Sequence, residues 1–341
     1  MHRHIIIYIA TLFLTATDAS AQIAGISCCD WMMLKRQKLG QLQLVKDING
    51  DGVEMDMGPL GRRVMFDNRF RGNEAEAEKF IRTADSLGVK VSSIAMSGFF
   101  AQSLISRRYD EYTLPDGTKT CHEHTAAERA ENYRLLFADL FATMKTFNAK
   151  TAFLPLGGSG REWQSGEGPA YDTICTRLHD IGEEAARHGI VVGIRTAMPA
   201  EFSLKMLDDI NSDGIKIYYN FQDACDRFKA GEAHGAKSAT QLICKELQTL
   251  GTRRICQIHV SNTDSVTLRH DPYIDMPTIR KTLKKIKYKG WLTVERSRNA
   301  KDVRNVRGNF GDNVAYLKEV FKLPDNGCSR HKGGEKAKKN E

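Results

Sequence analysis

The sequence predicts a single (β/α)8 TIM barrel. Eight short β-rich runs alternate with amphipathic helical stretches, which is the pattern of a parallel sheet covered by helices. The composition does not change between these units, so we expect no domain boundary within them. A doubly wound open sheet is the main alternative. The count of eight units, and the lack of a glycine-rich fingerprint after the first run, favour the barrel.

The expected strands are rich in β-branched residues, and several of them end in a polar one. Glycines such as Gly88, Gly189 and Gly290 stand where a helix ends or the next strand begins. The strands are predicted over Ala24–Cys29, Gly52–Asp56, Val91–Ser97, Thr151–Leu156, Ile190–Arg195, Ile215–Asn220, Ile255–Ser261 and Trp291–Arg296. The helices are predicted over Leu39–Ile48, Asn73–Leu87, Ala126–Phe147, Tyr171–His188, Ala200–Asn211, Ser238–Leu250, Met276–Ile286 and Asn309–Phe321.

Residues 1–21 are typical of an export signal rather than of the fold. Arg3 precedes the apolar run Ile5–Leu14, and Ala19-Ser20-Ala21 fits a signal-peptidase site. A retained membrane anchor is the alternative, but the run is shorter than the roughly 20 residues that span a bilayer. We therefore expect cleavage after Ala21, a barrel over residues 22–325, and a periplasmic or secreted protein without membrane contact after cleavage.

The net charge of +8 raises the question of a nucleic-acid partner. Much of the excess is spread over helix faces, as at Lys281 and Lys284, and more lies in residues 326–341, which are rich in Gly and Lys. No aromatic residues interleave with these charges as a base-stacking surface requires. We therefore expect a solvated basic surface, a disordered tail and no nucleic-acid partner.

The chemistry of a (β/α)8 barrel lies at the carboxyl ends of its strands. The polar residues predicted there are Glu54, Arg195, Asn220, His259 and Glu295. Alternation along a strand places Gln257 and His259 on one face, and Thr293 and Glu295 on one face. We therefore expect His259 and Glu295 to share a pocket at the barrel mouth.

Three of these strands carry a resemblance to a known family. Gly52-Val53-Glu54, Gln257-Ile258-His259-Val260 and Gly290-Trp291-Leu292-Thr293-Val294-Glu295 resemble the second, seventh and eighth strands of xylose-isomerase-like sugar isomerases and epimerases. The resemblance covers the whole predicted barrel in order and spacing. It implies proton abstraction next to the carbonyl of a sugar. It also implies a divalent cation held by Glu, Asp, His and Glu on strands five to eight, with His259 and Glu295 as the last two ligands.

The sequence departs from this pattern at two of the four ligands, with Arg195 in place of Glu and Asn220 in place of Asp. A guanidinium cannot coordinate a cation, and an amide oxygen ligates without charge. We therefore expect no metal cofactor or a weakly bound divalent metal. Either Asp223 and Glu54 rebuild a shifted site with His259 and Glu295, or Arg195 replaces the metal as the electrophile. In the second case His259, Glu295 or Asp223 would transfer the proton. An ion pair of Arg195 with Glu295 that leaves the site inert is the structural alternative.

The expected ligand is a small-molecule sugar. Export argues against a phosphorylated one, so a free sugar, a keto-sugar or a glycoside fragment is expected. Three classes of protein stay open: an isomerase or epimerase, a lyase acting on an oxidised glycoside, and a non-catalytic sugar-binding barrel. The sequence indicates neither the particular sugar nor the oligomeric state. The candidate substrate-binding residues are Asn220, Trp163 (as a stacking surface for the sugar), Arg161, Asn262 and Arg296.

The segment Gly98–His124 is long for a connection, and long loops on the catalytic face are often lids. His122 and His124 lie within it, and we expect them to be ordinary surface histidines because no third metal ligand is visible nearby. Export permits disulfides, and Cys121 with Cys225 is one possible pair.

Overall fold

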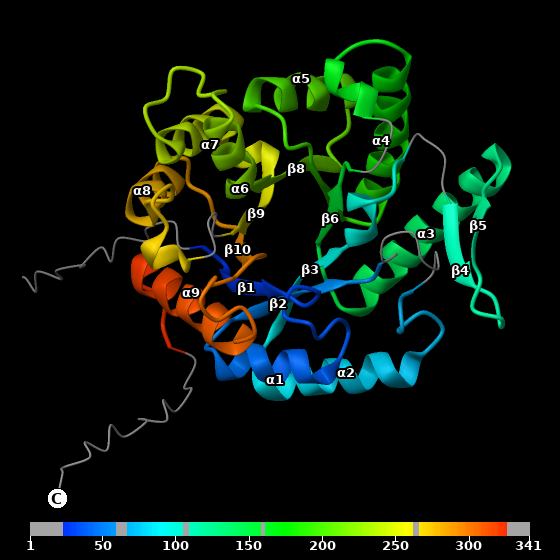
Figure 1. The fold of residues 1–341 in the computed structure, drawn as a ribbon, viewed down its shortest axis with the longest axis horizontal. Coiled ribbons are helices and arrows are strands. Elements are labelled where there is room, and N and C mark those ends of the chain that lie inside the picture. The colour runs from blue at the N-terminus through cyan, green and yellow to red at the C-terminus, as the bar shows by residue number, and fades with distance from the viewer. Residues whose placement is uncertain (1–22, 59–66, 105–108, 158–160, 262–265, 326–341) are drawn as a thin grey trace, which may run out of the picture.

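The computed structural model describes residues 23–58, 67–104, 109–157, 161–261 and 266–325. Eight parallel strands close into a barrel in the order β1-β10-β9-β8-β7-β6-β3-β2, and helices surround it (Figure 1). The predicted (β/α)8 fold is confirmed. The barrel strands are β1 (Gly25–Cys29), β2 (Gly52–Asp56), β3 (Lys90–Ala95), β6 (Thr151–Pro155), β7 (Val191–Arg195), β8 (Ile215–Asn220), β9 (Ile255–Val260) and β10 (Trp291–Val294).

The helices that cover the barrel follow the predicted order. They are α1 (Leu39–Asp47), α2 (Glu74–Leu87), α3 (Ala126–Thr146), α4 (Pro169–Arg187), α5 (Ala200–Ile210), α6 (Phe221–Lys229), α7 (Ala239–Arg254), α8 (Met276–Lys285) and α9 (Val306–Phe321). No helix in the described residues is long and apolar enough to cross a membrane. The expected signal at residues 1–21 and the expected tail at residues 326–341 lie outside the described residues.

Two strands end two residues earlier than the sequence predicts. β3 ends at Ala95, because the chain turns at Met96 into the short 3-10 helix η1 (Ser97–Phe100). β10 ends at Val294, although the backbone N–H of Glu295 still donates to the carbonyl oxygen of Val260 at 3.1 Å. Glu295 therefore stands one residue beyond the strand, at the rim of the barrel.

Helix α6 and a β-hairpin were not expected. The hairpin pairs β4 (Tyr109–Thr113) with β5 (Lys119–Glu123) in antiparallel register and lies at the edge of the molecule in Figure 1, beside α3. The segment expected to be a long loop is therefore partly a two-stranded sheet. Cys121 is exposed on this hairpin and Cys225 is buried in α6, and no disulfide joins them.

Helix α3 begins directly after the hairpin at a capping box. The Thr125 side chain accepts from the backbone N–H of Glu128, and the Glu128 carboxylate accepts from the backbone N–H of Thr125 at 2.7 Å. Such a reciprocal pair satisfies two otherwise unpaired donors and contributes about 1 kcal/mol. Only His124 and Thr125 lie between β5 and the first turn of α3, so the two elements are closely linked.

Candidate active site

A layer of hydrogen-bonded side chains crosses the barrel interior below its mouth. Ser27 and Thr293 share a hydrogen bond of 2.7 Å between their hydroxyls. The amide of Gln257 donates to the hydroxyl of Ser93 at 2.9 Å and to that of Thr293 at 2.8 Å. All four side chains are buried, so Gln257 and Thr293 point inward as strand alternation predicts. The layer supports the groups above it, because Ser93 also reaches Glu54.

Glu54 on β2 lies above this layer and accepts three hydrogen bonds. Ser93 donates to Oε2 at 2.7 Å and Tyr218 donates to the same oxygen at 2.5 Å, while Oε1 lies 2.6 Å from Nε2 of His259. Burial, and then the charge of Glu54, raise the pKa of Tyr218 well above its usual value, so its hydroxyl stays a donor. Gly193 makes room for this ring, since a Cβ there would lie 3.0 Å from Tyr218.

His259 on β9 is fully buried, and its two nitrogens are placed differently. Because Glu54 accepts at Nε2, that nitrogen carries the proton and Nδ1 holds the lone pair. Nδ1 is buried and makes no hydrogen bond with any described residue; it lies 3.9 Å from Oε2 of Glu295. The rings of Tyr218 and Phe153 pack against the imidazole at 4.4 and 4.5 Å between centroids. The carboxylate of Glu54 thus orients the imidazole of His259, as a carboxylate orients the histidine of a catalytic triad.

Arg195 at the end of β7 joins two carboxylates. Its Nη2 and Nε lie 2.6 and 2.9 Å from the two oxygens of Asp223, and its Nη1 lies 3.2 Å from Oε1 of Glu295. The ring of Phe100 lies 5.3 Å from the guanidinium carbon. Burial lowers the pKa of Arg195, but the charges of Asp223 and Glu295 outweigh burial and raise it above its usual value. A permanent positive charge therefore stands at the barrel mouth.

Glu295 links the two groups. Asn220 and Ser261 donate to its Oε2 at 2.7 and 3.1 Å. Burial raises the pKa of Glu295, but the charge of Arg195 and then these hydrogen bonds lower it to about 2. Glu295 is ionised at any ordinary pH, so it can stabilise positive charge but not release a proton. The predicted proximity of His259 and Glu295 is confirmed by their 3.9 Å separation.

Comparisons with known proteins agree with this architecture. Residues 42–320 match the family described as xylose isomerase-like TIM barrel. The chain belongs to the xylose isomerase-like TIM barrel family.

Solved structures of low identity share the fold. A D-psicose 3-epimerase from Clostridium cellulolyticum H10, solved with D-tagatose, is 9% identical with a TM-score of 0.61, over 87% of this chain and 99% of that one. A xylose isomerase domain protein from Planctomyces limnophilus is 16% identical with a TM-score of 0.57, over 82% and 92%. A 3-keto-D-glucoside 4-epimerase from E. coli is 11% identical with a TM-score of 0.57, over 86% and 98%. A search among curated protein sequences finds no match.

The cation expected of a xylose isomerase-like barrel does not fit these side chains. The guanidinium of Arg195 lies between the carboxylates of Asp223 and Glu295, where a cation would have to bind. Glu54 already accepts three hydrogen bonds, and Asn220 turns its amide nitrogen, rather than its oxygen, toward Glu295. The rebuilt site of His259, Glu295, Asp223 and Glu54 therefore has its negative charges neutralised or hydrogen-bonded by protein groups.

Two substrate-binding predictions differ from what the structure shows. Trp163 is 1% exposed and packs 6.2 Å from the ring of Phe202, so its face is covered by the core and is not offered to a sugar. Asn220 uses its oxygen to cap α6, accepting from the N–H of Gln222 at 2.8 Å, and its nitrogen to hold Glu295. It therefore positions Glu295.

The other predicted binding residues have no defined role in this structure. Arg161 and Arg296 are both exposed, and Asn262 lies outside the described residues. Their assignment as substrate-binding residues stays a prediction.

Sequence reasoning did not identify Trp31, Tyr218 or Ser93. Trp31 lies two residues past the end of β1 and is half-buried. It stacks on Phe153 at 6.4 Å with an interplanar angle of 3°, and it lies edge-on to His259 at 6.3 Å. An aromatic residue just past the carboxyl end of the first strand was the available signal. Trp31, rather than Trp163, is the aromatic side chain beside the candidate base.

Proposed function

We propose that this chain is an isomerase or epimerase of a non-phosphorylated sugar or keto-sugar, in which His259 abstracts a proton next to the carbonyl and Arg195 replaces the cation as the electrophile. One observation carries the proposal: Nε2 of His259 is held by Glu54, and the unprotonated Nδ1 faces the pair formed by Glu295 and Arg195. A buried base beside a fixed positive charge is what enolisation requires.

The reaction balances without a redox partner. The C–H bond next to the carbonyl breaks, its proton moves to Nδ1 of His259, and its electron pair forms the enediolate double bond. Negative charge develops on the former carbonyl oxygen. Asp223 and Glu295 use at least three of the five N–H groups of Arg195, and the rest are available to that oxygen. Glu295 stabilises the imidazolium that forms. For isomerisation, the proton returns from Nδ1 to the former carbonyl carbon, which regenerates His259, and the proton of the neighbouring hydroxyl passes to the former carbonyl oxygen.

The proton-transfer groups favour isomerisation between adjacent carbons. Epimerisation at one carbon uses a donor on the opposite face, and both nearby carboxylates are bound to Arg195. Glu295, with a pKa of about 2, holds no proton to deliver. One base that removes and returns the proton on the same face suits transfer between neighbouring carbons. A lyase would also need a protonated group for its leaving oxygen, which ranks it lower.

Charge supports a substrate without phosphate. Arg195 is balanced by Asp223 and Glu295, so this part of the mouth carries one positive and two negative groups. A phosphate dianion would meet net repulsion there. The expected export signal points the same way, and the epimerases of similar fold are named for psicose and for a keto-glucoside. We propose accordingly that the protein acts outside the cytoplasm.

A non-catalytic sugar-binding barrel is the second candidate, and two observations favour it. His259 is fully buried, and the cavity beside Arg195, lined also by Asn220 and Asp223, holds only about 20 Å³, which is room for one water. A sugar would reach Nδ1 only if side chains at the mouth move. The two candidates differ in whether a substrate proton exchanges.

Solvent isotope exchange tests the proposal without knowledge of the product. The protein is incubated in D2O and EDTA with a panel of free ketoses, aldoses and 3-keto-glycosides, and deuterium entry next to the carbonyl is followed by NMR. We expect exchange that EDTA does not abolish, that His259→Asn removes, and that survives in His188→Asn, whose histidine is exposed. A folded protein that binds a sugar without exchange supports the binding barrel. Exchange that requires an added cation overturns the role of Arg195.

A further inference from the structure

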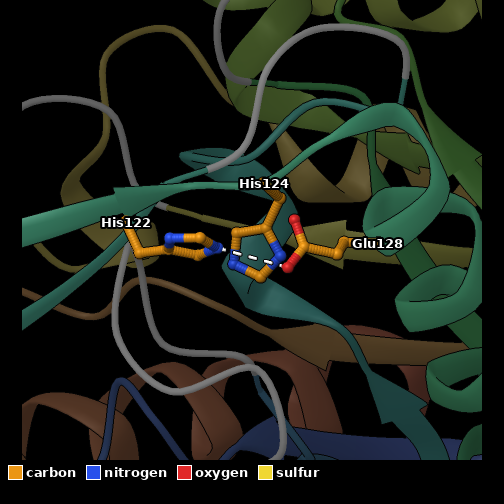
Figure 2. Close-up of side chains that lie close together, drawn as sticks. All are labelled: His122, His124 and Glu128. Carbon is orange, nitrogen blue, oxygen red and sulfur yellow. Dashed lines mark hydrogen bonds and ion pairs between the residues drawn. The ribbon is translucent and has the colours of Figure 1, made fainter.

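The hairpin carries a group of side chains that the proposed function does not use. His122, His124 and Glu128 each offer one ligand atom, and these atoms lie within 4.8 Å of one another (Figure 2). Among the described residues this is the one group of three or more His, Cys, Asp or Glu side chains that meets this limit. The expectation that no third ligand lies near the two histidines is therefore wrong. Glu128 is the third, brought beside them by the first turn of α3.

The local backbone structure brings these three side chains together. His122 is in β5, and His124 follows two residues later, so an extended chain places both rings on one side. The capping box fixes Glu128, whose Oε2 accepts from Thr125 while its Oε1 faces Nε2 of His122 at 3.4 Å. Figure 2 shows the rings and the carboxylate directed toward one point.

A second observation concerns the ring of His124, which is 7% exposed. Nδ2 of Asn132, which lies two turns into α3, is 2.9 Å from Nδ1 of this ring. Binding through Nε2 requires the proton on Nδ1, so the Asn132 amide must turn its oxygen to that nitrogen when a metal binds; Asn132 then fixes the tautomer and directs Nε2 at the metal. An ordinary surface histidine needs neither burial nor an oriented ring.

We propose that His122, His124 and Glu128 form a binding site for a divalent transition metal of the zinc type. Two imidazoles and a carboxylate suit Zn²⁺, and three protein ligands leave a fourth position for water. Ligand atoms in a tetrahedral zinc site lie about 3.3 Å apart, given metal–ligand bonds of about 2.0–2.1 Å. His122 is exposed and can rotate to reach this spacing around His124 and Glu128, whose Oε1 is not used by the capping box.

The site would join the hairpin to the barrel. Its ligands come from β5, from the two-residue connection and from the first turn of α3. A metal bound to all three fixes the direction in which the hairpin leaves the helix. Its role is structural and separate from the barrel mouth, so it does not depend on the chemistry proposed for His259.

Zinc titration of the full chain, stripped with EDTA and followed by calorimetry, tests the site. We expect one Zn²⁺ per chain and at least a tenfold loss of affinity in each of His122→Ala, His124→Ala and Glu128→Gln. Glu128→Gln is the sharpest variant, because glutamine preserves the capping box but removes the charged ligand. Glu131→Gln is the matched control, since Glu131 is exposed one turn later in α3 and pairs with Arg134. It should bind Zn²⁺ as the wild type does.

Two results would overturn the site: a wild type that binds no Zn²⁺, or triad variants that bind it as tightly as the wild type. Glu295→Gln shows whether bound zinc lies in the barrel instead, because it should leave the zinc affinity unchanged. His122→Ala should leave deuterium exchange unchanged. Failure of the exchange assay and failure of the zinc titration are therefore distinguishable.

Discussion

Two groups of polar side chains meet at the barrel mouth, and they handle charge differently. The Glu54 network consists of Glu54, Ser93, Tyr218 and His259, where one carboxylate is surrounded by neutral donors. The Arg195 network consists of Arg195, Asp223, Glu295 and Asn220, where opposite charges are paired directly. Because the groups that donate to Glu54 are neutral, the imidazole of His259 is free to accept a proton. The direct ion pairs of the Arg195 network instead keep Arg195 protonated and Glu295 ionised.

The two networks also differ in how far their side chains are exposed to solvent. The side chains of Glu54 and His259 are 0% exposed, and those of Arg195, Asp223 and Glu295 are 12–15% exposed. The fixed charges therefore lie nearer to solvent, and the base lies below them. In the proposed reaction this arrangement places Arg195 where a carbonyl oxygen would arrive first.

The largest expected effect tests the Glu54 network. Glu54→Gln presents an amide N–H to Nε2 of His259, which favours the tautomer with its proton on Nδ1 and removes the lone pair from the substrate side. We expect deuterium exchange to fall about 10³-fold, in line with the loss seen when a triad carboxylate becomes an amide. Tyr218→Phe, which removes one donor and keeps the carboxylate, should cost about tenfold or less. An equal loss in both variants would contradict a special role for the carboxylate.

Removal of Arg195 should lower stability in addition to abolishing the proposed electrophile. Arg195→Ala leaves Asp223 and Glu295 unpaired in a mostly buried site, and we expect urea denaturation to show a loss of about 3 kcal/mol. Lys205→Ala is the control, since its pair with Asp209 is largely exposed and should contribute less than about 1 kcal/mol. Equal effects in both variants would mean that the Arg195 network is no tighter than a surface ion pair.

Conversion of the Arg195 network should turn the mouth into a metal site. Arg195→Glu with Asn220→Asp removes the cation and supplies two anionic oxygens beside His259 and Glu295. We expect Mn²⁺ affinity to rise roughly 100-fold over either single variant, because ligand charge dominates hard-cation binding. The titration uses a His122→Ala background so that the hairpin does not contribute. A double variant that binds no better than the single ones would show that these two substitutions are not what separates this barrel from a cation.

The sequence predicts the barrel well where periodicity is strong and local. β2 and β8 begin and end at the predicted residues, since a glycine-containing turn precedes each strand and a polar residue ends it. Helix α6 was missed because it starts directly after β8 with no loop, and Asn220 serves both as the last residue of the strand and as the helix cap. The hairpin had a usable signal in Pro115-Asp116-Gly117, a turn sequence between two runs that contain Tyr and Thr.

The site was predictable as residue types but not as contacts. Strand ends gave Glu54, Arg195, His259 and Glu295, because every barrel strand points its carboxyl end at the same mouth. The bond from Glu54 to His259 joins positions 205 residues apart, and it depends on the closure of the barrel. Trp163 was predicted to bind the ligand because it is an aromatic residue that follows a strand, but the core buries it.

The smallest expected effect is a pH dependence of the stability that Glu295 contributes. Burial alone would raise the pKa of Glu295, but Arg195 and its other partners lower it from 4.5 to about 2. A carboxyl whose pKa is lowered on folding stabilises the protein fully above pH 4.5, and this contribution is lost as the pH falls toward 2. We expect about 1 kcal/mol of this stabilisation to be lost by pH 3.5.

Absolute stabilities are not the right quantity to measure, because burial raises the pKa of Asp30, and this changes stability with pH in the opposite direction. The quantity to measure is therefore the difference in unfolding free energy between wild type and Glu295→Gln, by urea denaturation at pH 6.5 and 3.5. That difference should shrink by about 1 kcal/mol in acid. A difference that does not depend on pH would mean that Arg195 does not hold Glu295 ionised, and the two networks would no longer be distinct.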